Sequence, residues 1–177
     1  MLSKQELRIN IRQLKAKYSP TRLHELSEVI LAKLEQNLRF QSAQNILLYH
    51  SLADEVQTHN FIERWATAKH ILLPKVVGDD LTLHPYLGKK SLSKGAFNIL
   101  EPNTPQFSDY NRIDMAVIPG MAFDKHCHRL GRGKGYYDRL LSQMPQHIYK
   151  IGIAFPFQII TEVPATELDI SVDEVIY

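Results

Sequence analysis

The residues best suited to chemistry lie in one glycine-rich run, Arg-Leu-Gly-Arg-Gly-Lys-Gly-Tyr-Tyr-Asp, at positions 129–138. Three of the chain's eight glycines alternate there with Arg132 and Lys134. Glycine lets another molecule approach the main chain closely. Successive exposed N–H groups form a concave site for anions, to which the two cations add full charges. We therefore interpret this run as a phosphate-binding loop.

The apolar residues that follow the run have helical spacing, which predicts a helix from about 135 to 144. A helix N-terminus favours phosphate, and Asp138 in its first turn could hold a magnesium ion shared with the phosphates. The run is not a Walker loop, because no Ser or Thr follows Lys134. The alternative is a flexible surface loop that caps a helix, with Asp138 compensating the helix dipole.

Other side chains suggest a metal or a ring substrate. Glu55 follows a predicted strand, and a carboxylate can accept two parallel hydrogen bonds from the adjacent donors of a pterin. Asp169 and Asp173 supply oxygen ligands of the kind that magnesium prefers. The alternatives are an ordinary loop acid at Glu55 and an acidic segment that serves solubility.

Two further motifs are weaker. The alternation His126-Cys127-His128 gives poor geometry for a metal, so we set that site aside. Tyr136 and Tyr137 could stack on a ring or orient a phosphate, and we expect at least one of them to pack in the core.

The first helix is predicted by a capping box, Ser3 with Glu6. It carries a basic stripe consisting of Lys4, Arg8, Arg12 and Lys15. Such a stripe is commonly a solvated face, and the functional alternative is that its first two cations reach an anionic ligand.

A second helix is predicted from Pro20 to about Arg39 with Leu38 on its apolar side, and Thr58 is expected to cap a third. Apolar runs predict strands at 46–49, 71–73, 115–118, 148–154 and 175–176, with Pro74 ending the second. Residues 76–83 suggest a hairpin, and 87–112 are expected to be mostly loop.

Strands that alternate with helices indicate an α/β fold, a layered, mostly parallel sheet with helices on both faces. We expect residues 1–177 to form a single Rossmann-like domain. Because ligands gather at the carboxyl ends of parallel strands, Glu55, the 131–135 loop and Asp169 should converge.

Composition excludes several classes of protein. The net charge of +2 is too small to indicate a nucleic-acid or membrane partner by bulk electrostatics. The single cysteine, Cys127, excludes an intramolecular disulfide, and apolar runs are far too short for a membrane span. With charges interrupting the first residues, no secretory signal is visible. We expect a cytoplasmic monomer.

The run at 129–138 strongly resembles the signature of the 5-formyltetrahydrofolate cyclo-ligase family. Further stretches are similar to that family: Lys4-x-x-Leu-Arg8, Tyr49-x-Ser51, Asp54-Glu55-Val56-x-Thr58, Gly95-x-Phe97-x-Ile99-x-Glu101-Pro102, Pro119-Gly120-x-Ala122-Phe123-Asp124, Glu167-x-Asp169 and Val172-Asp173-Glu174-Val175.

This resemblance implies an ATP- and Mg²⁺-dependent enzyme that converts 5-formyltetrahydrofolate to 5,10-methenyltetrahydrofolate through a phosphorylated formyl group. It implies ATP contacts by Lys4, Arg8, Arg129, Leu130, Gly131, Arg132, Gly133, Lys134, Gly135, Tyr136 and Tyr137. It implies folate contacts by His50, Glu55, Arg132, Lys134 and Tyr136, of which the last three also act in catalysis. It implies Asp138 and Asp169 as magnesium ligands.

Two rival functions stay open on the residues alone. The loop would also suit an enzyme acting on a phosphorylated sugar or an acyl-CoA, which would need neither ATP nor folate. A non-enzymatic nucleotide- or RNA-binding module would need a larger basic surface with exposed aromatic residues.

Overall fold

The computed structural model describes residues 2–95 and 100–177. Phe97 and Ile99, part of one family-like stretch, lie outside the described residues. The described α-helices are α1 Lys4–Lys15, α2 Pro20–Gln36, α3 Leu38–Ser42, α4 His59–Trp65 and α5 Tyr136–Ser142, and the 3₁₀ turns are η1 Lys89–Ser91, η3 Tyr110–Arg112 and η4 Pro156–Gln158. The described strands are β1 Asn45–Leu47, β2 His70–Val77, β3 Asp80–Pro85, β4 Leu92–Lys94, β5 Leu100–Pro102, β6 Met115–Ile118, β7 Ala122–Phe123, β8 Arg129–Leu130, β9 Tyr149–Ile153 and β10 Glu174–Ile176.

The largest sheet among these elements has the order β10-β9-β6-β1-β2-β3. Its strands pair in parallel except for β3, which is antiparallel to β2. From β1 the chain builds outward through β2 and β3, whereas β6, β9 and β10 extend the other side. The strand order therefore reverses between β1 and β6, and such a reversal opens a crevice at the carboxyl ends of the two strands.

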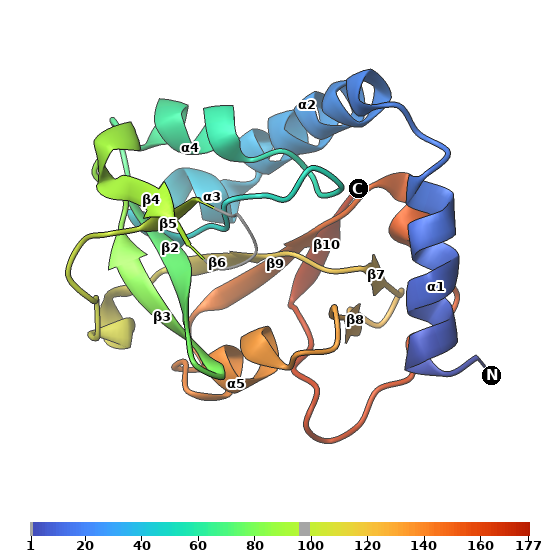
Figure 1. Ribbon diagram of the computed structural model, residues 1–177. Coiled ribbons are helices and arrows are strands. Elements are labelled where there is room, and N and C mark those ends of the chain that lie inside the picture. The colour runs from blue at the N-terminus through green and yellow to red at the C-terminus, as the bar shows by residue number, and fades with distance from the viewer. Residues whose placement is uncertain (1, 96–99) are drawn as a thin grey trace.

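Helices cover both faces of this sheet, as the α/β prediction requires (Figure 1). Side chains alternate along each strand, so Ile46 and Leu48 join one buried cluster with Phe40 and Phe61 from α3 and α4. Leu47 faces the other way, into a cluster with Leu140 and Leu141 of α5. The predicted fold class is confirmed.

Helix α1 stands beside the two-stranded β7–β8 sheet at one end of the molecule (Figure 1). Leu7 and Ile11 pack there with Ala122 and Leu130. The capping box is present, since the Ser3 N–H donates to Glu6 Oε2 at 2.8 Å and the Glu6 N–H donates to Ser3 Oγ at 3.3 Å. The packing of Leu7 and Ile11 against Leu130 brings the basic stripe of α1 close to β8, the strand that begins the glycine-rich run.

Several local predictions were wrong. Asn37 ends α2 and caps α3 through hydrogen bonds from Arg39 and Phe40, so Leu38 falls on the outside and is 79% exposed. Strand β2 continues through Pro74, which pairs with β3. A proline has no N–H to donate to a neighbouring strand, but β1 pairs only with residues 70–72 of β2 and therefore requires no hydrogen bond from Pro74.

Two more differences concern loops. Thr58 makes no side-chain cap to α4, because its hydroxyl donates to the Tyr49 carbonyl and accepts from the Ser51 N–H. The 87–112 segment contains the small β4–β5 hairpin as well as loop. No helix among the described residues is long and apolar enough to cross a membrane.

Candidate active site

A cavity of about 570 Å³ opens at the crevice between β1 and β6. Tyr49 and His50 line it from the segment after β1, and Pro119 and Gly120 line it from the segment after β6. The residues that the family resemblance implies for ligand binding all line this same cavity: Lys4, Arg8, His50, Glu55, Arg129, Leu130, Gly131, Arg132, Gly133, Lys134, Gly135, Tyr136, Tyr137, Asp138 and Asp169. Asp173, the other acidic residue considered for magnesium, is not among the lining residues and pairs with Lys150 Nζ at 2.9 Å instead. The fold thus brings together residues from the N-terminal helix, the β1–α4 segment, the glycine loop and the C-terminal segment.

The glycine loop adopts a conformation that ordinary residues avoid. Gly133 has φ 102° and Gly135 has φ 69°, and both angles lie in the region that a Cβ disfavours. A Cβ at Gly133 would also lie 3.3 Å from Cζ of Arg8. Arg8 in turn donates through Nε to the Gly131 carbonyl at 2.8 Å. Arg8 therefore lies directly against the loop, and α5 begins at Tyr136 as predicted.

Lys4 and Asp169 form an ion pair at one side of the cavity. Lys4 Nζ lies 2.6 and 2.5 Å from the two carboxylate oxygens of Asp169. Burial alone would raise the pKa of Asp169, but hydrogen bonds from Lys4 and Thr166 lower it. The carboxylate is therefore charged and already held by a cation.

Asp138 is paired in the same way with a buried arginine. Arg129 Nη2 donates to Asp138 Oδ1 at 2.6 Å, and the Ile170 N–H adds a longer contact of 3.3 Å. Arg129 is only 5% exposed, and its Nε has no hydrogen-bond partner among the described residues. A buried guanidinium with an unsatisfied donor beside a cavity is suited to an anionic ligand.

Glu55 also lines the cavity and binds the central arginine of the glycine loop. Arg132 Nε and Nη2 lie 3.1 and 3.0 Å from Glu55 Oε1, and the Leu52 N–H donates to Oε2 at 2.9 Å. Arg132 also binds Asp54, at 2.7 Å. The position of Asp54 in this network was not predicted, because its partner is 78 residues away in sequence.

His50 lies at the cavity beside a second histidine. The rings of His50 and His59 stack with centroids 3.7 Å apart, and His59 Nε2 lies 2.9 Å from the Ser51 carbonyl. Burial first, and then the His59 ring, lower the pKa of His50 to about 4, against an opposing effect of Glu63. His50 is therefore neutral near pH 7. His59 was not singled out in the sequence, where it was one of eight histidines.

The two tyrosines have different surroundings. Tyr137 packs against the core cluster that contains Leu140, with Arg129 5.7 Å from its ring centre. Burial raises the pKa of Tyr137, and the charge of Glu55 raises it further. Tyr136 lies at the cavity with its hydroxyl 3.5 Å from the Gly78 carbonyl. As expected, one of the pair packs in the core.

An apolar wall that the sequence analysis missed completes the cavity. It consists of Pro74 and Val76 from β2, Leu81 from β3 and Leu100 from β5. For Val76 and Leu81 a signal was present, because the predicted 76–83 hairpin has alternating faces. The cavity lining thus offers cations suited to phosphates and apolar side chains suited to a ring.

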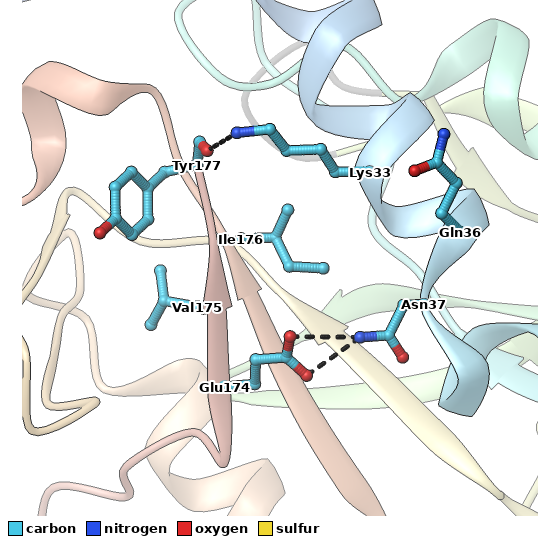
Figure 2. Close-up of a pocket in the computed structure, with 7 residues that line it drawn as sticks. All are labelled: Lys33, Gln36, Asn37, Glu174, Val175, Ile176 and Tyr177. Carbon is cyan, nitrogen blue, oxygen red and sulfur yellow. Dashed lines mark hydrogen bonds between the residues drawn. The ribbon is translucent and has the colours of Figure 1, made fainter.

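A smaller hollow of about 320 Å³ lies beside β10, the edge strand of the large sheet (Figure 2). Two polar contacts cross it: Lys33 Nζ donates to the Tyr177 carbonyl at 2.5 Å, and Asn37 Nδ2 lies 3.0 and 3.2 Å from the Glu174 carboxylate oxygens. It is not a candidate for catalysis.

Known proteins that resemble this chain over nearly its whole length identify its family. Residues 1–177 match the model of the 5-formyltetrahydrofolate cyclo-ligase family. A 5-formyltetrahydrofolate cyclo-ligase from Mus musculus is 31% identical over 190 residues, covering 99% of this chain and 93% of the mouse protein.

Two solved structures are similar over nearly the whole chain. The NMR structure of Aquifex aeolicus 5,10-methenyltetrahydrofolate synthetase has a TM-score of 0.87 and 32% identity, covering 98% of this chain and 88% of that one. A 5,10-methenyltetrahydrofolate synthetase from Mycoplasma pneumoniae has a TM-score of 0.80 and 30% identity, covering 99% and 98%.

Proposed function

The chain belongs to the 5-formyltetrahydrofolate cyclo-ligase family, and from that premise we propose that the 570 Å³ cavity binds 5-formyltetrahydrofolate and ATP together. The observation that carries the assignment is the convergence of cations, carboxylates and an apolar wall on one cavity at the reversal of strand order. We further propose that residues 1–177 act as one domain.

The enzyme converts 5-formyltetrahydrofolate to 5,10-methenyltetrahydrofolate and releases ADP and phosphate. The formyl oxygen attacks the γ-phosphorus of ATP and ADP leaves. N10 then attacks the formyl carbon, its proton is lost, and the oxygen departs with phosphate. Phosphorylation converts a poor leaving group into a good one. The protein's task in such a transfer is positioning and charge neutralisation, so no covalent nucleophile is needed.

The cations that line the cavity support triphosphate binding. Lys134 is exposed at the loop and has no ion-pair partner among the described residues, so its ammonium is available to a phosphate. Arg8 already contacts the loop backbone, and Arg129 carries an unsatisfied donor. We assign Arg132 and Lys134 to the charge that develops on the transferred phosphoryl group.

Asp138 and Asp169 are the residues that would hold magnesium. The described residues contain no group of three or more His, Cys, Asp or Glu that could bind a metal by themselves. Two carboxylates fit magnesium nonetheless, because this ion commonly takes one or two carboxylates beside substrate phosphates. When bound, the ion would neutralise phosphate charge. Lys4 and Arg129 balance the two carboxylates before the ligands arrive.

The folate end of the cavity is assigned to Glu55, His50 and Tyr136. The Glu55 carboxylate can accept paired hydrogen bonds from the pterin, while a neutral His50 avoids placing a second cation near the ring. The apolar residues Pro74 and Val76 offer a surface for its face.

We also propose that the enzyme is a cytoplasmic monomer; its single cysteine, which allows no intramolecular disulfide, supports a reducing compartment. Membership of this family favours small-molecule substrates over the sugar-phosphate, acyl-CoA and RNA-binding alternatives.

A direct test mixes the purified protein with 5-formyltetrahydrofolate, ATP and magnesium and follows the near-ultraviolet absorbance of the methenyl product. The expected result is a signal that needs all three components and is matched by ADP in equal amount. ADP formation that does not respond to the folate, or no product from folded protein, would contradict the proposal.

A further inference from the structure

Four charged side chains form a line that ends in the cavity. Lys15 Nζ lies 3.1 Å from Asp54 Oδ2, Asp54 Oδ1 lies 2.7 Å from Arg132 Nη2, and Arg132 Nη2 lies 3.0 Å from Glu55 Oε1. The signs alternate, so each inner member is held by two neighbours of opposite charge. Glu55 and Arg132 line the cavity, and Lys15 and Asp54 are not among its lining residues.

Lys15 is unusual for a lysine at the end of a surface helix, because it is only 5% exposed. A buried ammonium is costly unless it is paired. Its carboxylate partner is Asp54, 39 residues away in sequence. Burial alone would raise the pKa of Asp54, but Lys15 and Arg132 together lower it. Lys15 therefore keeps Asp54 charged and in contact with Arg132.

Arg132 thus pairs with two carboxylates, Asp54 and Glu55, and of these Glu55 alone lines the cavity. If Glu55 binds the pterin, as the proposed function states, its oxygens are needed by substrate donors, and Oε2 already accepts from Leu52. Arg132 must then lose at least one of its two hydrogen bonds to Glu55 Oε1. Asp54 lies outside the cavity lining and keeps its hold while the folate binds.

We propose that Asp54, anchored by Lys15, is a positioning residue that keeps Arg132 at the phosphoryl-transfer site when folate occupies Glu55. This inference rests on the proposed function, because it needs Arg132 to act on the phosphoryl group and Glu55 to bind the pterin. Without Asp54, Glu55 is the one carboxylate among the described residues that still pairs with Arg132, and folate and Arg132 compete for it.

The test is a double-mutant cycle of Asp54→Asn and Arg132→Ala, read as kcat and as KM for each substrate. Asp54→Asn should lower kcat/KM for the folate about tenfold to a hundredfold, the change expected for one charge-assisted hydrogen bond, with KM for the folate raised. In the Arg132→Ala background the same substitution should have almost no further effect, because residues that act through one another are not additive. A merely structural role would lower kcat in both backgrounds and leave both KM values unchanged.

The outcomes separate this inference from the proposed function. Wild-type activity in Arg132→Ala would overturn the assignment of Arg132 itself. An impaired Arg132→Ala together with a fully active Asp54→Asn, or with additive losses in the double variant, would overturn only the positioning role.

A second variant removes the risk of misfolding. Asp54→Asn leaves the buried Lys15 unpaired, whereas the double substitution Lys15→Met with Asp54→Asn removes both charges. It should fold and show the same rise in KM for the folate; a wild-type KM in folded protein would contradict the proposal. Glu25→Gln, at the exposed Arg22–Glu25 pair, is the matched control and should behave as wild type.

Discussion

At the scale of single residues, Lys134 is the cation whose loss should affect turnover most directly. It lies exposed at the loop, with no ion-pair partner among the residues described, so its ammonium is available to the phosphoryl group. We expect Lys134→Ala to lower kcat by about 10²- to 10³-fold, the usual loss for one donor to developing charge. Steady-state kinetics test this, with the exposed Lys90→Ala as control. Near wild-type turnover would refute the role.

Glu55 should govern folate affinity instead. Glu55→Gln replaces an acceptor of paired hydrogen bonds by an amide that can accept only one and must donate the other, so we expect folate to bind about tenfold to a hundredfold more weakly. Calorimetric titration with 5-formyltetrahydrofolate in the absence of ATP measures this. ATP affinity is the internal control, and unchanged folate affinity would remove Glu55 from the pterin site.

At the scale of elements, the glycine loop depends on backbone angles that side chains resist. We expect Gly133→Ala to lower the free energy of unfolding by about 1–3 kcal/mol and to raise KM for ATP, because the new Cβ meets Arg8. Gly78→Ala is a matched control: its φ is also positive, at 60°, but nothing lies within 4 Å of the added Cβ. It should lose stability and keep its KM. The same KM for ATP in both variants would contradict a role of the contact between Arg8 and the loop in ATP binding.

His50, in the segment between β1 and α4, should make the free energy of unfolding decrease in mild acid. Because the folded-state pKa of His50 is about 4 and its ordinary value is 6.5, the unfolded chain binds the extra proton first. Stability is therefore lost as pH falls from 6.5 towards 4. His50→Gln should flatten the fall in unfolding free energy between pH 7 and pH 5 in urea titrations. The exposed His147→Gln should not; a wild-type slope in His50→Gln would contradict the pKa.

Helices and strands were predictable from sequence where a short local pattern, such as a capping box or an apolar run, was enough to determine them. The Ser3–Glu6 capping box and the 115–118 apolar run gave α1 and β6. Predictions failed where tertiary partners decided: Thr58 bonds Tyr49 and Ser51 rather than its helix, and Pro74 is tolerated only because β1 is short.

At the scale of the whole molecule, residue types alone suggested the glycine loop, Glu55, Asp138 and Asp169 as site residues, and the motifs that carry the family resemblance added others such as His50 and Arg129. Those motifs selected residues that do line one cavity, and their roles stay proposals. Pairings between distant segments were not predictable. The basic stripe of α1 looked uniform, yet Lys4 pairs with Asp169, Arg8 contacts the loop and Lys15 is buried against Asp54. Periodicity reveals a helix face, but not which distant residue that face meets.

The central claim is that this one cavity passes the γ-phosphoryl group to the formyl oxygen. The most direct measurement uses 5-formyltetrahydrofolate labelled with ¹⁸O in the formyl group and analyses the released phosphate by mass spectrometry. The account predicts one ¹⁸O atom in each phosphate released with methenyl product. Unlabelled phosphate, with the label recovered in water, would contradict it.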